Sequence, residues 1–174
     1  MYYETIMGGA LDKTLEAEEV QEDSVFVGYV EHVQNPNHFW IRTQKRNEEF
    51  EEMMTKMEDH FSHVKLEEDV LVDPELGAQC CAVYEKDMHF YRGVVTDTLE
   101  HGAEVLFIDF GNIEKVPHML IKKIPEAFAR KSAFAFCCTL VDVFPLDEVW
   151  TSSSSDAFRQ AVSNKALLVH VVQR

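Results

Sequence analysis

The chain has 174 residues, of which 46% are hydrophobic, so it can bury the core of one domain or of one domain inserted into another. Its 16 basic and 31 acidic residues give a formal net charge of −15. This charge disfavours nucleic acid, because nucleic-acid affinity depends on neutralising phosphates with lysine and arginine. A field of this sign instead attracts basic ligands, including arginine-rich tails.

Signals for membranes, metals and disulfides are weak. No run of about 18 apolar residues is present, and the N-terminus lacks the features of a signal peptide, so we expect a soluble intracellular protein or a piece of one. The cysteines form two adjacent pairs, Cys80-Cys81 and Cys137-Cys138, which predict free, mostly buried thiols, with a disulfide between the pairs as the alternative. His60 and His63 lie one helical turn apart without an evident third ligand, so no metal or cofactor is predicted.

Basic residues gather in one part of the chain only. They are Lys115, Lys122, Lys123, Arg130 and Lys131. A solvated loop face is a better interpretation of this cluster than a phosphate-binding patch, given the overall acidity.

The first part of the chain predicts a hairpin followed by a helix. Residues 1–23 are acidic and predict a linker or a short helix. Residues 25–33 and 38–43 read as two strands around the turn Asn35-Pro36-Asn37. Residues 47–64 carry apolar side chains at helical spacing: Phe50, Met53, Met54, Met57, Phe61 and Val64. This methionine-rich face favours core packing over a peptide groove.

The middle of the chain predicts four short strands, at 79–84, 90–97, 104–110 and 113–116, with hairpin signals at His101-Gly102 and Gly111-Asn112. Such spacing indicates a small, highly curved sheet or barrel. It lies between segments that read as one split domain. The expected divisions are 24–71 and 125–174 for the two parts of the split domain, and 72–124 for the barrel.

Beyond Pro125, residues 132–143 read as a buried strand and residues 156–162 as a short helix capped by Ser155 or Asp156. Residues 167–172 read as a final strand, which is still running where the sequence stops. We therefore expect the second part of the split domain to be truncated.

Sequence motifs of catalysis are missing. The chain has no glycine-rich phosphate loop, no Gly-x-Ser-x-Gly elbow and no metal-ligand spacing with a third partner. We therefore expect a binding module and not an enzyme.

Four aromatic residues fall at strand ends or beside turns of the predicted barrel: Tyr84, Tyr91, Phe107 and Phe110. A box of ring faces attracts a cation. Methylated arginine suits such a box, because methylation keeps the charge, removes hydrogen-bond donors and makes the head more apolar. Asn112 would then bond a remaining guanidinium N–H. On spacing alone, core packing is favoured over a cage, because Phe107 and Phe110 point to opposite faces unless the chain bends at Gly111.

Two stretches of the barrel closely resemble the Tudor-domain signature. They are His89-Phe90-Tyr91-Arg92-Gly93 and Val105-Leu106-Phe107-Ile108-Asp109-Phe110-Gly111-Asn112. Upstream, Pro36-x-x-Phe39-Trp40-Ile41 looks like the first hairpin of extended Tudor domains in germline Tudor-domain-containing proteins. The resemblance covers residues 25–172. It implies a mainly β fold with a few helices, in which a Tudor β-barrel is inserted into a staphylococcal-nuclease-like, OB-type fold.

The same resemblance implies a site and a ligand. The cage would be Tyr84, Tyr91, Phe107 and Phe110, with Asn112 as the polar contact. Phe107 and Phe110 stand where tyrosine is common, which removes hydroxyl contacts but keeps the ring faces. Arg92 and Asp109 occupy positions that look structural and are expected to pair across the barrel.

The ligand implied is symmetric dimethylarginine in an Arg-Gly- or Arg-Ala-rich tail of a PIWI-type Argonaute protein. This places the module in the piRNA pathway, in cytoplasmic germ granules, and we expect it to be monomeric. Three alternatives stay open: recognition of unmethylated arginine tails by the acidic surface, a residual nuclease on the OB-like half, and a scaffold whose rings serve only as core.

Overall fold

The computed structural model describes residues 21–173. The strands in this part of the chain are β1 (Val25–Asn35), β2 (His38–Thr43), β3 (Gln79–Tyr84), β4 (His89–Leu99), β5 (Gly102–Phe107), β6 (Ile113–Pro117), β7 (Ile121–Lys122), β8 (Ala135–Cys138) and β9 (Leu167–His170). The helices are α3 (Asn47–Ser62), α4 (Glu126–Ala129) and α5 (Ser152–Val162), with 3-10 turns η1 (Gln44–Arg46) and η2 (His118–Leu120). Most of the acidic segment predicted at 1–23 lies outside the described residues. None of the helices in the described part is long and apolar enough to cross a bilayer.

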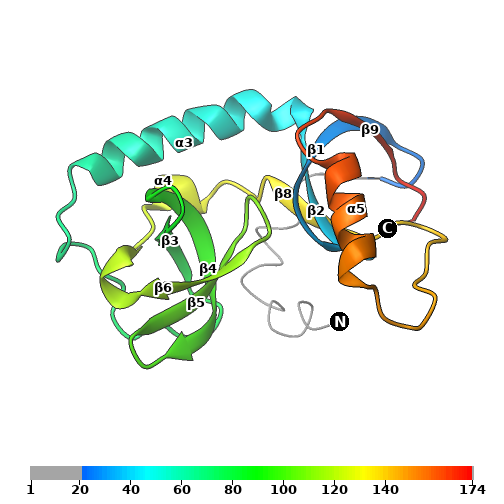
Figure 1. Cartoon of the computed structure of the whole chain (residues 1–174). Coiled ribbons are helices and arrows are strands. Elements are labelled where there is room, and N and C mark those ends of the chain that lie inside the picture. The colour runs from blue at the N-terminus through cyan, green and yellow to red at the C-terminus, as the bar shows by residue number, and fades with distance from the viewer. Residues whose placement is uncertain (1–20, 174) are drawn as a thin grey trace.

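The strands form two antiparallel sheets, and the smaller one draws its strands from both ends of the described chain. Its order is β8-β2-β1-β9, so the first hairpin is flanked by the last two strands. The five-stranded sheet, ordered β6-β5-β4-β3-β7, comes from the chain between them. Figure 1 shows the two sheets as separate lobes, with helix α3 running from one to the other. The prediction of a mainly β fold with an inserted barrel is confirmed.

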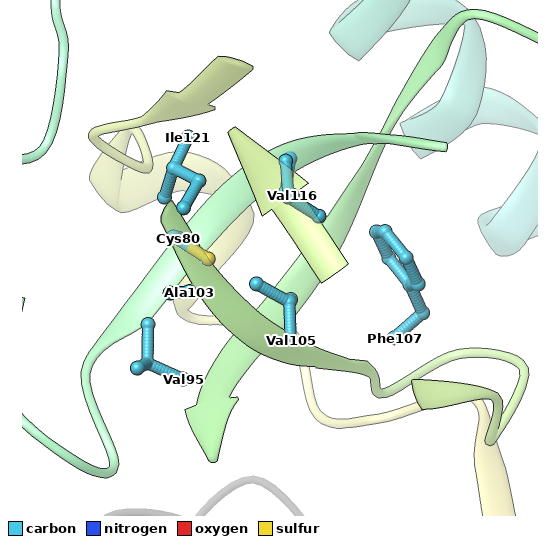
Figure 2. Packing of buried hydrophobic residues seen from close by; sticks show 8 residues of the cluster. Cys80, Val95, Ala103, Val105, Phe107, Val116 and Ile121 are labelled. Atoms are coloured by element: carbon cyan, nitrogen blue, oxygen red, sulfur yellow. The ribbon is translucent and has the colours of Figure 1, made fainter. Parts of the chain in front are cut away.

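Strand β5 contributes to two cores at once. Val105 and Phe107 pack inside the five-stranded sheet together with Val95. In Figure 2, Phe107 lies at one side of this cluster, with Val105 between it and Val95. Leu106 points to the other face and packs against Trp40 of β2. Because successive strand residues face opposite sides, one strand fills the barrel and also seals the contact between the two lobes.

Helix α3 buries one face along its whole length. The buried side chains recur at helical spacing: Phe50, Met53, Met57 and Phe61. They pack with Phe128 and Phe134 from the chain that leaves the barrel. Phe61 also stacks on Phe90 of β4, with ring centroids 4.3 Å apart. The predicted helix and its packing role are confirmed, and the helix ends at Ser62 instead of Val64.

The strand predicted at 132–143 is wrong over most of its length. Only β8 is extended, and it pairs with β2 from Ala135 opposite Arg42 to Cys138 opposite Phe39. The ladder with β2 ends at Cys138, and beyond it the Leu140 backbone N–H donates to the Pro36 carbonyl in the turn between β1 and β2. The chain turns instead, with a positive φ of 56° at Asp142. An apolar run without a partner strand does not fix a strand.

The cap predicted for the last helix is also wrong. Helix α5 begins at Ser152, and its N-cap is Thr151, whose side chain accepts a hydrogen bond from the Ser154 backbone N–H. The serine run at 152–155, which precedes the predicted helix, therefore forms the first turn of the helix. Strand β9 ends at His170 and not at residue 172.

The basic residues predicted to share one solvated face have different surroundings in the structure. Lys122 is only 2% exposed, and its ammonium donates to the backbone carbonyls of Lys65, Leu66 and Glu68. Lys131 lies against Glu49, and Arg130 pairs with Glu126. The solvated-face prediction therefore fails at Lys122, which ties β7 to the chain that follows α3.

The cysteines are free thiols. Cys80 and Cys81 are buried in the five-stranded sheet, and Cys138 is half-buried, whereas Cys137 is exposed. Burial raises the pKa of the Cys80 thiol to about 12, so this group stays protonated at neutral pH. Within the described residues, no group of three or more histidines, cysteines or carboxylates is placed to hold a metal ion.

Candidate ligand-binding site

Four aromatic side chains meet at one end of the barrel, where its strands begin and end. Tyr84 is the last residue of β3, Tyr91 lies near the start of β4, and Phe107 is the last residue of β5. Phe110 follows in the turn that leads to β6. These are the four residues that the sequence nominated, and the fold brings all of them together.

Tyr91 is the centre of the arrangement. Its ring centroid lies 6.3 Å from that of Tyr84, 6.0 Å from that of Phe107 and 5.2 Å from that of Phe110. The Tyr84 and Phe107 centroids are 5.9 Å apart. All four pairs are edge-to-face, with interplanar angles between 64° and 84°. The rings therefore stand as walls at steep angles to one another, and we refer to these four side chains as the ring box.

The four rings differ in exposure. Phe107 is 1% exposed and belongs to the barrel core, whereas Tyr84, Tyr91 and Phe110 are half-buried. Phe107 thus forms a floor, and the other three rings form a rim that solvent reaches. A cation at the rim would meet these three rings first.

A tight turn places Phe110 beside Tyr91. The strand predicted to run to Phe110 ends at Phe107, because the backbone N–H groups of Phe110 and Gly111 both bond to the Phe107 carbonyl, at 3.1 and 2.7 Å. Gly111 adopts φ +104°, and a Cβ atom there would lie 2.1 Å from Trp40 Cγ. The bend that the cage hypothesis required is present, and it needs glycine both for its backbone and for its space.

A buried ion pair holds the base of this turn. The Arg92 guanidinium donates to both oxygens of Asp109, at 2.9 and 2.6 Å. Arg92 also donates to backbone carbonyls of the chain that leaves the barrel, at Phe128, Lys131 and Ser132. Both side chains are about 1% exposed. The predicted pairing of these two residues across the barrel is confirmed.

Asn112 follows Gly111 in the same turn, directly before β6. Its backbone carbonyl accepts a hydrogen bond from the Phe107 N–H at 2.9 Å, and its side-chain amide nitrogen donates to Glu114 at 3.2 Å. The amide oxygen is the atom of this side chain that can accept from a guanidinium N–H. Glu114 also adds a negative charge near the rim.

Two contacts of the ring box are not evident in the sequence. The Tyr91 hydroxyl donates to the Asp87 carboxylate, and burial together with this carboxylate raises the pKa of Tyr91. Phe50 of α3 meets Phe110 edge-to-face, with centroids 5.8 Å apart. Asp87 lies in a hairpin turn, where an acidic residue gives no periodic signal, and Phe50 reads as ordinary helix core.

Comparison with known proteins identifies the family. Residues 20–142 match the Tudor domain family. The chain is 31% identical over 145 residues to human Tudor domain-containing protein 6, which covers 83% of this chain and 7% of that protein. It is 32% identical over 147 residues to human Tudor domain-containing protein 5, covering 80% of this chain and 15% of that protein. The chain therefore spans a small part of the curated relatives.

Solved structures agree in fold. The human TDRD1 extended Tudor domain, in complex with a symmetrically dimethylated peptide, superposes with a TM-score of 0.84 at 24% identity, covering 95% of this chain and 81% of that one. The third extended Tudor domain of mouse TDRD1, in complex with a MILI peptide containing dimethylarginine, gives 0.83 at 24% identity, covering 90% and 80%. An aspartate-to-alanine variant of the Drosophila melanogaster Papi extended Tudor domain, in complex with an unmethylated Piwi N-terminal peptide, gives 0.77 at 22% identity, covering 83% and 74%. The chain belongs to the Tudor domain family, and its fold is that of an extended Tudor domain.

Proposed function

We propose that this chain is a methylarginine reader that binds symmetric dimethylarginine in Arg-Gly- or Arg-Ala-rich tails of PIWI-type Argonaute proteins. The observation that carries the proposal is the ring box, in which Tyr91 meets three other aromatic rings at distances of 5.2–6.3 Å. Aromatic faces attract cations by roughly 0.5–1 kcal/mol each when exposed and by about 2 kcal/mol when desolvated.

The chemistry of the box favours a methylated head over a bare one. Its walls are aromatic rings, two of which carry a hydroxyl group; the Tyr91 hydroxyl is bonded to Asp87, and the Asn112 amide is bonded to Glu114. An unmodified guanidinium carries five donors that need partners, whereas methylation replaces some of them with apolar groups and keeps the charge. A methylated head therefore loses less hydrogen bonding to water when it enters.

Related structures support the same ligand class. The human and mouse extended Tudor domains named above were both solved with dimethylated peptides. The acidic surface of this chain, with its net charge of −15, suits a basic tail. We infer that the module helps to assemble piRNA-pathway complexes in cytoplasmic germ granules, as a monomeric unit within a longer protein.

We also propose that the module binds without catalysis. The ring box offers aromatic faces and a neutral amide, which suit recognition of a cation, and its Tyr91 hydroxyl is already engaged as a donor to Asp87. We expect single-stranded RNA to survive incubation with the protein in calcium or magnesium. Cleavage that follows the protein through purification, seen on a denaturing gel, would support the residual nuclease instead.

A second candidate is recognition of unmethylated arginine by the acidic surface. The specific observation in its favour is the Papi structure, which holds an unmethylated Piwi peptide in the same fold. In this reading the carboxylates supply the affinity, and the ring box makes little difference between modified and unmodified peptides.

A calorimetric titration separates these candidates. One arginine–glycine peptide is titrated in three forms: unmodified, asymmetrically dimethylated and symmetrically dimethylated. We expect the symmetric form to bind most tightly, because its two methyl groups lie on different nitrogens and leave one N–H on each. Equal affinity for all three forms would reject methyl reading and favour the acidic-surface candidate.

A further inference from the structure

A cavity of about 400 Å³ lies beside the ring box, between helix α3 and the β3–β4 hairpin. Side chains from both elements line it, including Glu51, Met54, Glu58, Met88, His89 and Tyr91. Tyr91 belongs to both places, since it lines this cavity and also contacts the other three rings of the box. The cavity therefore adjoins the proposed methylarginine site at Tyr91.

Two acidic residues on another face of α3, Glu49 and Glu52, pair with lysine or arginine. Glu52 pairs with Lys56 at 2.8 Å. Glu49 pairs with Arg46 at 3.3 Å and with Lys131 at 3.4 Å. These ion pairs lower the pKa values of both glutamates, chiefly through hydrogen bonds from Arg46 and Lys56. Negative charge at these two positions is already compensated within the molecule.

The two glutamates at the cavity have much less compensation. Glu51 makes no ion pair within the described residues, and Glu58 approaches only His89, with 3.8 Å between the carboxylate oxygen and the ring nitrogen. The lining contains no lysine or arginine. The cavity therefore holds two carboxylates, and the one basic side chain in its lining is His89, in a protein of net charge −15. This is the electrostatic complement of a basic side chain.

The rest of the lining suits the stem of such a side chain. The stacked rings of Phe61 and Phe90 form part of the wall, and Met54 and Met88 flank them. Met88 is 62% exposed, so its flexible thioether is free to adjust to a neighbour. Arginine and lysine combine a hydrocarbon stem with a charged tip, and they bury the stem while the tip stays near water or carboxylates.

We propose that this cavity is a second recognition subsite, which takes an unmethylated arginine or lysine close in sequence to the methylated arginine of the same peptide. The inference rests on the proposed function, because it assumes that the ring box holds the methylated residue. The stem lies along the methionines and the stacked phenylalanines, and the cationic tip reaches Glu51 and Glu58. The module then reads a pair of basic residues, of which one is methylated.

The spacing of the pair follows from peptide geometry. In an extended peptide, side chains two residues apart point to the same side and lie about 6–7 Å apart. The ring box and the cavity share one side chain, Tyr91, so a separation of this order matches the distance across a single aromatic residue. We therefore expect the second basic residue two positions before or after the methylarginine.

Calorimetric titration with designed peptides tests the subsite. Each peptide carries one symmetric dimethylarginine in a glycine–alanine background, with alanine or arginine two positions before it or two positions after it. We expect one of the two arginine peptides to bind about fivefold to tenfold more tightly than its alanine counterpart. If neither arginine improves affinity, the subsite does not exist, whatever the methylation result.

Three variants locate the effect. The double variant Glu51→Gln/Glu58→Gln removes the cavity carboxylates and should reduce the advantage of the second arginine to less than twofold. Thr55→Lys places a cation in the cavity wall, since Thr55 also lines it, and should have the same effect. The matched control is Glu52→Gln/Asp59→Asn, which removes two charges at the same spacing on the neighbouring helix face and should keep the full advantage.

The controls separate this proposal from the methyl-reader proposal. Affinity for the peptide with methylarginine alone should change by less than twofold in the cavity variants, because the ring box is intact. An unchanged advantage of the second arginine in both cavity variants overturns the subsite. An equal loss in the control variant also overturns it, since the advantage then reflects only total charge. Loss of methyl preference with a retained second-arginine advantage rejects the proposed function alone.

Discussion

Tyr91 is held by several neighbours at once. Its ring meets Tyr84, Phe107 and Phe110, and its hydroxyl group donates to Asp87. A side chain with this many contacts keeps its orientation in the free protein, so little rotamer entropy is lost when a ligand enters. The acidic partner also places negative charge beside the box without exposing a carboxylate inside it. We infer that Asp87 positions Tyr91 and contributes to the attraction of a cation.

At the residue scale, Gly111→Ala tests how the turn is built. The substitution places a methyl group against the Trp40 indole and keeps a backbone that side chains rarely adopt, with φ +104°. We expect a loss of about 2–4 kcal/mol in the free energy of unfolding, combining overpacking with backbone strain. Urea denaturation measures it.

Gly77→Ala is the matched control for this turn. Gly77 also has a positive φ, of 85°, but a Cβ atom there has no neighbour within 4 Å. The control should lose only the backbone contribution, about 1 kcal/mol. A Gly111→Ala protein that is as stable as Gly77→Ala would mean that the Trp40 contact does not constrain the turn.

At the element scale, the barrel is fastened to the chain that leaves it by Arg92 and Asp109. Asp109 also accepts a hydrogen bond from the Phe134 backbone N–H at 2.9 Å. One ion pair therefore links β4, the turn after β5 and the segment before β8. Because Phe110 follows Asp109 directly, the same pair fixes one wall of the ring box.

Removing one partner of this pair should be costly. Asp109→Ala leaves the Arg92 charge buried without its counter-ion, and we expect a loss of about 3–5 kcal/mol in the free energy of unfolding. The exposed pair Glu126–Arg130 provides the control, since both of its side chains are more than 70% exposed. Glu126→Ala should cost no more than about 0.5 kcal/mol. Thermal and urea unfolding of the two variants measure these losses. Similar losses of unfolding free energy in Asp109→Ala and Glu126→Ala would contradict the structural role of the buried pair.

At the scale of the whole molecule, the net charge of −15 should act on the rate of association. Exposed charges steer a basic peptide toward the protein over distances that salt screens, with a Debye length of about 10 Å at 0.1 M. We expect the association rate constant of an arginine-rich peptide to fall about tenfold between roughly 50 and 300 mM salt. The dissociation rate should change much less.

Stopped-flow measurements over this salt range check the prediction. The affinity ratio of methylated to unmodified peptide should stay nearly constant, because the ring faces act at contact distance. A ratio that disappears at high salt would indicate that methylation is read through long-range charge and not through the rings.

Much of the fold was predictable from the sequence because its signals are local. The hairpin, helix α3 and the barrel strands follow from periodicity and turn residues, and the order of these elements predicts a barrel inserted into a split domain. Errors arose where a distant partner decides the structure. Strand β8 is short because its ladder with β2 holds only four residue pairs before the chain turns at Asp142. Lys122 is buried because three carbonyls from another segment surround it.

In the site, too, local sequence signals were predictive and contacts with distant segments were not. The identities of Tyr84, Tyr91, Phe107 and Phe110 were accessible through the family signature, whereas strand periodicity alone separated Phe110 from Phe107. The turn that joins them depends on Gly111 packing against Trp40, a residue far earlier in the chain. Asp87 and Phe50 could not be assigned to the site in advance, because their roles arise only when the hairpin and helix α3 meet at the rim.

The most direct test of methyl reading is a double-mutant cycle between the peptide's methyl groups and the Phe110 ring. Affinities of the unmodified and symmetrically dimethylated peptides are measured by calorimetry for the original protein and for Phe110→Ala, with Phe144→Ala, a 79% exposed ring, as control. We predict that Phe110→Ala weakens the methylated complex by about 1–2 kcal/mol, or roughly 5–30-fold, and the unmodified complex much less. Equal losses for the two peptides, in a variant whose fold is intact, would contradict the assignment of the ring box as the methylarginine site.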